Sequence, residues 1–197
     1  GGGSIAWIDK GGLLRVGPQS AGADPGPICY DAGGTEVTVT DANLVLGRLN
    51  PHYFLGGSIP LNREKAEAAL TALGERLGLD CYEAAQAVID IANENMANAI
   101  RLLSIDRGLD PREFALVAFG GAGPLHAGDI AAKMGMRHIV VPVYPGLTSA
   151  FGALIAQPKV SKVWSKHFRS DSCSCETIDA HFKEMIASVI AELRAEG

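Results

Sequence analysis

FALVAFGGAGPLHAGDIAAKMGMRHIVVPVYPG, residues 114–146, is the stretch of sequence that decides the fold. It opens with a continuous apolar run, Phe114–Phe119, which is typical of a strand buried on both faces of a sheet. The turn Gly120–Gly123 leads into a helical pattern from about Pro124 to Met134, and a second apolar run covers Ile139–Val143. Strand, glycine turn, helix and strand in this order predict a βαβ unit and therefore the α/β class.

The glycine turn is the strongest candidate binding site. Without a Cβ, glycine lets backbone N–H groups approach an anion or a nucleotide, and the N-terminus of the following helix adds partial positive charge. The spacing does not match GxGxxG, and the chain has no GxxxxGK[ST] loop. A tight turn without a ligand is the alternative. We expect a nucleotide site of neither Rossmann nor Walker type at Gly120, Gly121, Ala122 and Gly123.

Residues 1–59 are rich in glycine and carry short apolar runs, so strands and turns are expected there rather than helices. The strand candidates are Ile5–Ile8, Leu13–Val16 and Val37–Thr40, with a hairpin turn at Asp9–Gly12. The run GADPGP, residues 22–27, is expected to be irregular because proline fixes its own φ and restricts the residue before it.

Helical patterns dominate from Asn62 onward. Asn62 is a candidate N-cap for a helix that ends near Gly78. Asp80 and Glu83 have the spacing of a capping box, and apolar residues at helical spacing extend this second, long helix to about Gly108.

Three parts are expected along the chain. Residues 1–59 form a glycine-rich strand and loop segment, and residues 60–156 form an α/β nucleotide-binding subdomain with a helix at Ser149–Ile155. Residues 157–197 form an edge segment, Val160–Phe168, protected by lysines, and a terminal helix at Ile178–Ala195.

The composition excludes several classes of protein. Lys and Arg number 17 against 22 Asp and Glu, a net charge of −5, so nothing favours nucleic acid or an anionic membrane. No run of about 18 apolar residues and no signal peptide are found. The four cysteines include one close pair but lack the second pair of a zinc site, so a structural zinc ion is not expected. A reduced, cytoplasmic compartment is the expectation for this chain. Without an initiator Met, the chain is expected to be a fragment.

Two carboxylates in the glycine-rich segment are candidate site residues. Both lie in or beside turns from which Mg²⁺ could be reached through water. We take Asp24 as a candidate catalytic residue and Asp41 as a candidate magnesium ligand. The alternatives are that Asp24 only forms a turn and that Asp41 caps a helix over residues 42–49.

His126, in the first turn of the helix after the glycine turn, is a second candidate catalytic residue. A histidine there tends to stay neutral and could hydrogen-bond a substrate carbonyl or a nucleotide hydroxyl. A buried histidine with structural partners is the alternative. Asn95, Asn98 and Arg101 share one side of the long helix, which faces either a cleft or solvent, and Cys29 is expected to pack in the core.

Five long motifs point to a known family. GGGSIAWID (1–9), VGPQSAGADPGPICYDAGGTEVTVTDANLVLGRL (16–49), NENMANAIR (93–101), VAFGGAGPLHA (117–127) and VPVYPGLTSAFGALIA (141–156) occur in this order. Together they resemble the hydantoinase A and oxoprolinase family. The resemblance covers about residues 1–156.

The resemblance implies part of an actin-like (ribonuclease H-like) ATPase fold. Gly120–Gly123 would be the adenosine-side turn, and Ser149–Ile155 would connect the two halves of the fold. The family's phosphate hairpins have the form Asp-x-Gly-Gly-Thr. Asp31–Thr35 matches this bare pattern, but it follows an irregular loop and lacks the strands of a hairpin, so it is interpreted as a loop.

The resemblance also implies ATP and Mg²⁺ as cofactors and an ATP-dependent cyclic amide hydrolase, which activates a lactam or imide carbonyl by phosphorylation. The implied partners are a small cyclic amide, a hydantoinase B-like subunit or domain, and further copies of the protein. A subunit of an acetone or acetophenone carboxylase is the alternative, and a non-catalytic nucleotide-binding module is a third hypothesis.

Overall fold

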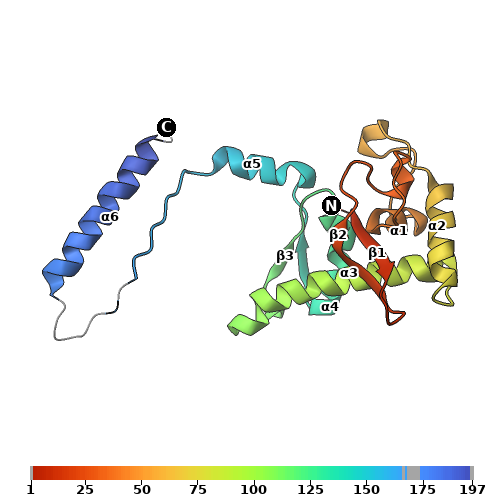
Figure 1. Cartoon of the computed structure of the whole chain (residues 1–197), viewed down its shortest axis with the longest axis horizontal. Coiled ribbons are helices and arrows are strands. Elements are labelled where there is room, and N and C mark those ends of the chain that lie inside the picture. Colours follow the sequence, from red (N-terminus) through yellow and green to blue (C-terminus); the bar gives the residue numbers. More distant parts are fainter. Residues whose placement is uncertain (1, 166, 168–173, 196–197) are drawn as a thin grey trace. The chain divides into compact units, whose positions relative to one another are not determined.

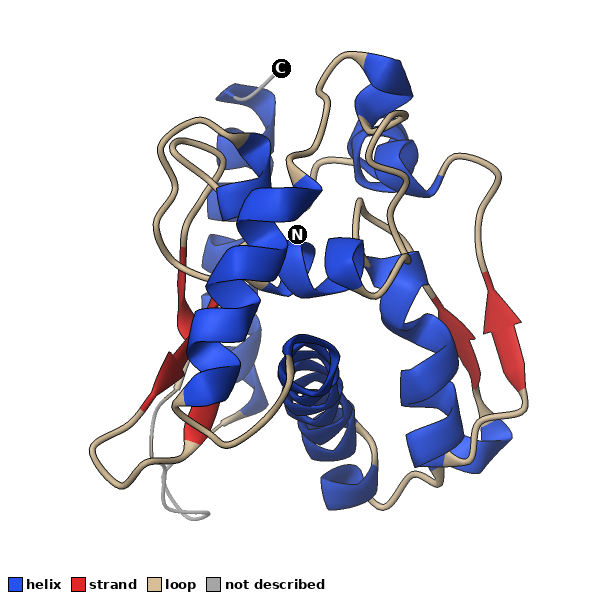
Figure 2. Ribbon diagram, turned by 90° about the vertical axis from the view of Figure 1, so that its right-hand side faces the viewer, coloured by secondary structure: helices blue, strands red, loops and turns tan. Residues whose placement is uncertain are grey.

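The computed structural model describes residues 2–165, 167 and 174–195. The chain divides into two compact units, Gly1–Ser149 and Ala150–Gly197 (Figure 1). Helices are the main regular elements of both units, and the strands form two small pairs (Figure 2). The three parts expected at 1–59, 60–156 and 157–197 stay a prediction.

The first unit begins with an antiparallel hairpin, β1 (Ser4–Ile8) and β2 (Leu14–Ser20), which confirms the first two predicted strands. The turn between them is closed by Asp9, whose Oδ1 accepts from the N–H groups of Gly11 (2.9 Å) and Leu13 (3.0 Å). These bonds fix the turn because one carboxylate satisfies two backbone donors at once.

The third predicted strand, Val37–Thr40, is wrong. Helix α1 (Val39–Val45) begins there with Thr38 as its N-cap, and Asp41 lies three residues inside, where it completes a capping box. The side chain of each of these two residues accepts from the backbone N–H of the other, and these reciprocal bonds stabilise the start of a helix. This stabilisation outweighs the preference of the β-branched residues for an extended backbone. Asp41 is therefore not the N-cap, and the helix lies three residues earlier than the expected 42–49.

The two following helices confirm their predicted N-caps. Asn62 caps α2 (Arg63–Glu75), and Asp80 with Glu83 forms the capping box of α3 (Cys81–Leu103). Helix α3 runs through the first unit, with α1 and α2 beside its N-terminal part and β3 and α4 beside its C-terminal part (Figure 1). It ends before the expected Gly108 because a 3₁₀ turn, Ile105–Arg107, follows.

Two apolar clusters hold the first unit together. The larger cluster joins the hairpin, α1, α2 and the first half of α3, and its fully buried side chains include Leu44, Leu70, Val88 and Ile89. The smaller cluster has the buried side chains Ala97, Ile130 and Met134. Nothing buried is shared between the two clusters.

The predicted βαβ unit is confirmed. Strand β3 (Ala115–Val117) pairs in parallel with β4 (His138–Val140), and α4 (Gly123–Met134) connects them. The expected burial on both faces is wrong: Val117 is 52% exposed and Val140 is 49% exposed. Leu116 packs against the smaller cluster, so the described residues cover one face of this sheet only. An apolar run in the sequence predicts a strand with apolar side chains, but it does not predict which residues cover each face of the sheet.

The second unit contains the predicted terminal helix, α6 (Cys175–Ala195). Helix α5 (Thr148–Ile155), also predicted, crosses the boundary between the units. Trp164 stacks on His181 of α6 at 4.4 Å between ring centroids, and Lys162 pairs with Glu192 at 3.0 Å. Of the predicted edge segment, Lys166 and Phe168 lie outside the described residues.

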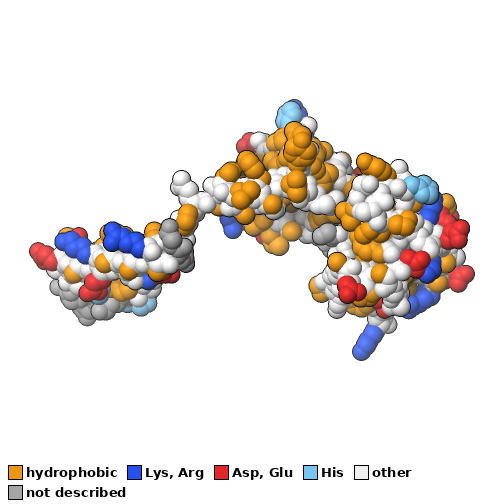
Figure 3. Space-filling model, turned by 90° about the horizontal axis from the view of Figure 1, so that it is seen from above, with side chains coloured by type: hydrophobic (Ala, Val, Ile, Leu, Met, Phe, Trp, Pro, Cys, Tyr) orange, Lys and Arg blue, Asp and Glu red, His pale blue; other side chains and the backbone are white. Residues whose placement is uncertain are grey.

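Hydrophobic side chains lie exposed among polar ones over the surface of the chain (Figure 3). Within the described ranges, no helix has both the length and the apolar character needed to cross a membrane.

Candidate functional site

The glycine turn lies at the carboxyl end of β3 and faces a cavity of about 290 Å³, as the sequence predicts. The N–H of Gly120 donates to the carbonyl of Pro145 at 2.8 Å, and the φ of Gly120 is +86°, a value that favours glycine. This bond ties the turn to the segment after β4. The cavity is lined by Gly2, Ser4, Val16, Val39, Ala92, Asn95, Met96, His126 and the turn residues 119–123.

Open space surrounds the turn on the side where side chains would stand. A Cβ built on Gly121 or Gly123 would meet no atom within 4 Å. Among the described residues, nothing accepts from the N–H groups of Gly121, Ala122 or Gly123. The N–H groups of Gly121, Ala122 and Gly123 and the N-terminus of the 12-residue α4 therefore lie at the cavity. There they can donate hydrogen bonds to acceptor atoms of a ligand.

The cavity combines an apolar wall with few polar side chains. Val16, Val39 and Met96 provide the apolar wall, and Asn95 reaches it from α3 while its Nδ2 donates to the carbonyl of Val16 at 3.1 Å. This mixture is typical of small-molecule sites.

Of the three polar residues expected on one side of α3, only Asn95 reaches this cavity. Asn98 accepts from Arg101 at 2.6 Å, and Arg101 lines a separate cavity with Arg112 and Lys133. The expectation of one shared side is therefore only partly right, because the spacing of three and six residues places Asn98 and Arg101 about 60° and 120° around the helix axis from Asn95.

His126 lies in the first turn of α4, lines the cavity and is only 2% exposed. Its Nδ1 lies 2.7 Å from Asn93 Oδ1, and its Nε2 lies 3.4 Å from Asn43 Nδ2. Burial lowers the pKa of His126, the charge of Arg48 lowers it further, and Asp129 opposes both. With both ring nitrogens occupied, the contacts favour a structural role, and the catalytic role stays a prediction.

The sequence alone did not reveal four residues that surround His126: Asn43, Arg48, Asn93 and Asp129. A signal was present for one of them. Asn93 lies four residues after Ile89 and four before Ala97, on the buried stripe of α3, where an amide needs hydrogen-bond partners. Its partner could not be found without the fold, because Asp129 and His126 are more than 30 residues away in the sequence.

Asp24 and Asp41 lie outside the cavity. Asp24 is exposed in the irregular loop, and the structure does not bring it to His126 or to the turn. Asp41 is fully buried, and its carboxylate accepts from Thr38 N (2.8 Å), Thr38 Oγ1 (2.7 Å), Cys29 N (2.8 Å) and Ile28 N (3.4 Å). These bonds do not fit a metal ligand, and the magnesium role of Asp41 stays an unsupported prediction.

Within the part of the chain that the structure describes, no cluster of three or more His, Cys, Asp or Glu side chains could hold a metal ion. Cys29 is buried, as expected, and burial together with the nearby Asp41 raises the pKa of its thiol.

The Asp31–Thr35 stretch is a packed loop. Asp31 pairs with Lys65 and accepts from Asn62 Nδ2 at 3.1 Å, while a Cβ on Gly34 would lie 2.2 Å from the carbonyl oxygen of Gly26. Its second glycine therefore serves close backbone packing, which supports the loop interpretation of the Asp-x-Gly-Gly-Thr match.

A βαβ unit whose glycine turn opens on a cavity at the carboxyl end of its strand defines a mixed α/β protein with a candidate ligand site at that edge. The family model described as hydantoinase/oxoprolinase matches residues 1–162. The chain belongs to this family, which confirms the resemblance found in the sequence.

Two similar proteins are named as subunits of different enzymes. The chain is 41% identical over 198 residues to the caprolactamase subunit alpha of Pseudomonas jessenii, covering 100% of this chain and 28% of that protein. It is 42% identical over 206 residues to the acetophenone carboxylase gamma subunit of Aromatoleum aromaticum, again covering 100% and 28%.

The crystal structure of the ATP-dependent caprolactamase from Pseudomonas jessenii matches with a TM-score of 0.72 and 48% identity, over 77% of this chain and 22% of that one. The chain therefore spans about 28% of the length of the two relatives.

Proposed function

We propose that this chain forms one wall of the nucleotide site of an ATP-dependent enzyme that opens cyclic amides. One observation carries the proposal: the free N–H groups of Gly121–Gly123 and the N-terminus of α4 face a cavity with an apolar wall. The family and the similarity to an ATP-dependent caprolactamase support ATP as the ligand of this cavity.

In this proposal the fold is part of an actin-like ATPase domain, and the glycine turn receives the adenosine side of ATP. The apolar side chains Val16, Val39 and Met96 would contact the nucleoside, and the turn would approach it with backbone only. The γ-phosphoryl group of ATP would pass to the amide oxygen with release of ADP, which makes the carbonyl carbon electrophilic enough for water to add. The C–N bond of the ring would then break with the nitrogen leaving as an amine, and the resulting acyl phosphate would hydrolyse to a carboxylate and phosphate. This chain's contribution is to bind and orient the nucleotide.

The described residues do not fit a magnesium site, since Asp41 is committed to four donors and Asp24 stands alone on the surface. We therefore assign no step to Mg²⁺ in this chain. The relatives are named as subunits, which supports a multisubunit assembly for the whole protein. The proposal assigns a hydantoinase B-like subunit or domain as the partner.

A carboxylase subunit is the second candidate function. The acetophenone carboxylase gamma subunit is as similar to the chain as the caprolactamase subunit is, so sequence similarity does not separate the two. Both activities would use the same nucleotide wall. Measuring ADP release by the full-length protein with a panel of lactams and hydantoins, and with ketones plus bicarbonate, separates them.

Gly121→Val tests the nucleotide site itself. The Cβ of the new side chain meets no atom within 4 Å and Gly121 has no positive φ, so we expect the fold to be retained, while the valine side chain fills the space through which the N–H groups reach a ligand. Loss of one hydrogen bond to the uncharged adenosine, about 0.5–1.5 kcal/mol, corresponds to roughly 2- to 13-fold weaker ATP binding in the full-length protein.

Gly128→Val is the matched control, because Gly128 also has open space around its Cβ position and lies on α4 away from the cavity. We expect its ATP affinity to equal that of the wild type. Equal ATP affinities for the wild type, Gly121→Val and Gly128→Val would show that the glycine turn does not bind the nucleotide.

A further inference from the structure

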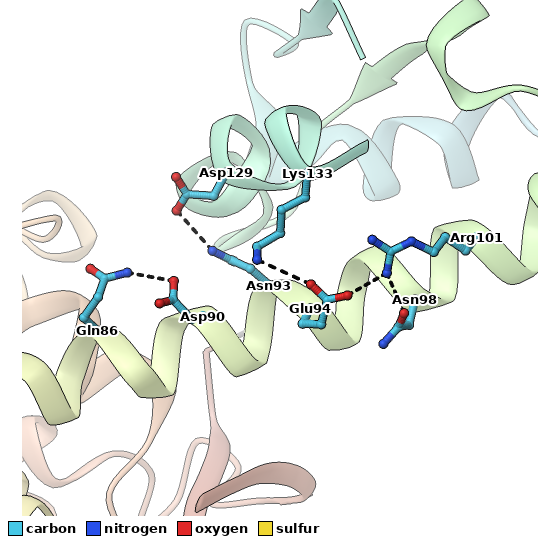
Figure 4. A network of polar contacts seen from close by, with 8 residues as sticks. All are labelled: Gln86, Asp90, Asn93, Glu94, Asn98, Arg101, Asp129 and Lys133. Atoms are coloured by element: carbon cyan, nitrogen blue, oxygen red, sulfur yellow. Dashed lines mark hydrogen bonds and ion pairs between the residues drawn. The ribbon is translucent and has the colours of Figure 1, made fainter. Parts of the chain in front are cut away.

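Five polar side chains form one continuous chain of hydrogen bonds between α1, α3 and α4. Arg48 Nη1 and Asn93 Nδ2 both donate to Asp129 Oδ2, at 3.0 and 3.1 Å. Asn93 Oδ1 then meets His126 Nδ1 at 2.7 Å, and His126 Nε2 meets Asn43 Nδ2 at 3.4 Å. Figure 4 shows Asn93 extending from α3 to Asp129 on α4. We call these five residues the polar chain.

The donors and acceptors of the polar chain can be assigned from one end. A carboxylate only accepts, so Asn93 must turn its Nδ2 toward Asp129 and its Oδ1 toward His126. His126 Nδ1 must therefore carry the proton and donate it. The neutral ring then has a lone pair on Nε2, which accepts from Asn43 Nδ2.

The polar chain lies where the two apolar clusters meet. Helix α4 contributes Ile130 and Met134 to the smaller cluster, and none of its side chains joins the larger one. His126, one turn upstream, is the side chain through which α4 reaches Asn43 on α1. It follows Gly123 by three residues, so its position also sets the position of the glycine turn.

We propose that Asn93 is a positioning residue, which fixes His126 as the neutral Nδ1–H tautomer and thereby holds the first turn of α4 and the glycine turn against the cavity. The role of the cavity as a nucleotide site rests on the proposed function, whereas the action of Asn93 on His126 does not. Asn93 itself does not line the cavity.

The charges around His126 are few. Arg48, after α1, and Asp129, on α4, face it, while α3 presents the uncharged amide of Asn93. Glu94 on α3 is committed to Arg101 and Lys133, at 2.6 and 3.4 Å (Figure 4). Asn43 Oδ1 is buried without a partner in the part of the chain that is described.

Asn93→Asp in the full-length protein tests the proposal. The substitution keeps the shape of the side chain, places a carboxylate against Nδ1–H and replaces the 3.1 Å donor to Asp129 by an acceptor. The two adjacent carboxylates favour the charged ring and raise the pKa of His126 by about one pH unit or more. Exchange of the C2 hydrogen of each histidine with deuterium, followed by mass spectrometry across a pH series, measures this pKa. Asn98→Asp is the matched control, since Asn98 lies on the same helix outside the polar chain.

Asp129→Asn gives a second variant at a partly exposed position, which does not depend on the folding of Asn93→Asp. Removing the carboxylate that favours the imidazolium shifts the pKa of His126 in the opposite direction, downward. An unchanged pKa of His126 in both variants would overturn the assignment of Asn93.

Amide deuterium uptake in the same samples tests the link to the glycine turn. We expect uptake over residues 119–127 to rise at least severalfold in Asn93→Asp and to stay unchanged in Asn98→Asp. Unchanged uptake with a shifted pKa would overturn the positioning of the turn. If the wild type binds no ATP, the proposed function fails. The histidine C2 exchange and the amide deuterium uptake still test whether Asn93 positions His126 and the glycine turn.

Discussion

Asp41 joins two parts of the chain through one buried carboxylate. Its Oδ1 accepts from Cys29 N, and its Oδ2 accepts from both groups of Thr38, so the loop before α1 and the start of α1 share a single acceptor. A buried charge of this kind is stabilised because several backbone donors replace the lost water. The same commitment explains why the residue is unsuited to a metal ion.

Asp41→Asn is expected to lower the free energy of unfolding by about 3 kcal/mol, since the amide NH₂ would face donors and leave buried N–H groups without an acceptor. Urea unfolding followed by circular dichroism measures the change. Asp106→Asn, at an exposed position, is the control and should fall within about 0.5 kcal/mol of the wild type. A similar loss in both variants would contradict the role given to Asp41.

His126 predicts a pH dependence of stability. Burial holds its pKa below the usual value of about 6.5. His126 therefore binds a proton less readily in the folded protein than in the unfolded chain. Above pH 6.5 both states are neutral and stability is full. As pH falls below this value the unfolded state gains protons first, and the free energy of unfolding decreases until the folded pKa is reached.

Urea midpoints between pH 7.5 and 5.5 check this sign. The decrease should be smaller in His126→Gln than in the wild type, while His52→Gln, at an exposed position, should keep the slope of the wild type. If His126→Gln and the wild type lose stability equally over this range, the buried histidine does not cause it.

Individual elements were predictable to different degrees. The N-caps of α2 and α3 were found because a cap is a local interaction between residues two or three positions apart. The same logic applied to Thr38 and Asp41, but the β-branched run at 37–40 favoured a strand. The cavity at the glycine turn was predicted from strand–turn–helix order, whereas the polar chain was not, because its members come from α1 and the turn after it, from α3 and from α4, which are far apart in the sequence.

Asp80→Ala tests a local element. Removing the N-cap of α3 leaves the N–H of Glu83 without its 2.8 Å acceptor and should cost about 1 kcal/mol of stability. Asp90→Ala, on the exposed side of the same helix, is the comparison and should cost less. Thermal unfolding monitored at 222 nm provides the measurement, and equal losses would argue against the capping box.

At the scale of the whole molecule, the proposed function assigns to this chain one wall of a nucleotide site. Expressed alone, residues 1–197 are expected to bind ATP at least tenfold more weakly than the full-length protein and to hydrolyse none at a useful rate. The described residues offer backbone donors and an apolar wall, but no metal cluster to stabilise the transition state. Fluorescent nucleotide titration and an ADP release assay measure both properties, and robust metal-dependent turnover would contradict the proposal.

The separation of the two apolar clusters also orders events during synthesis. Every buried side chain of the larger cluster lies between Ala6 and Ala92, whereas the smaller cluster needs Met134. At roughly 5–20 residues per second, the ribosome needs a few seconds to add the intervening residues. A nascent chain can therefore pack the side chains of its larger cluster before His126 is available to Asn43 and Asn93. The cavity at the glycine turn forms after the larger cluster.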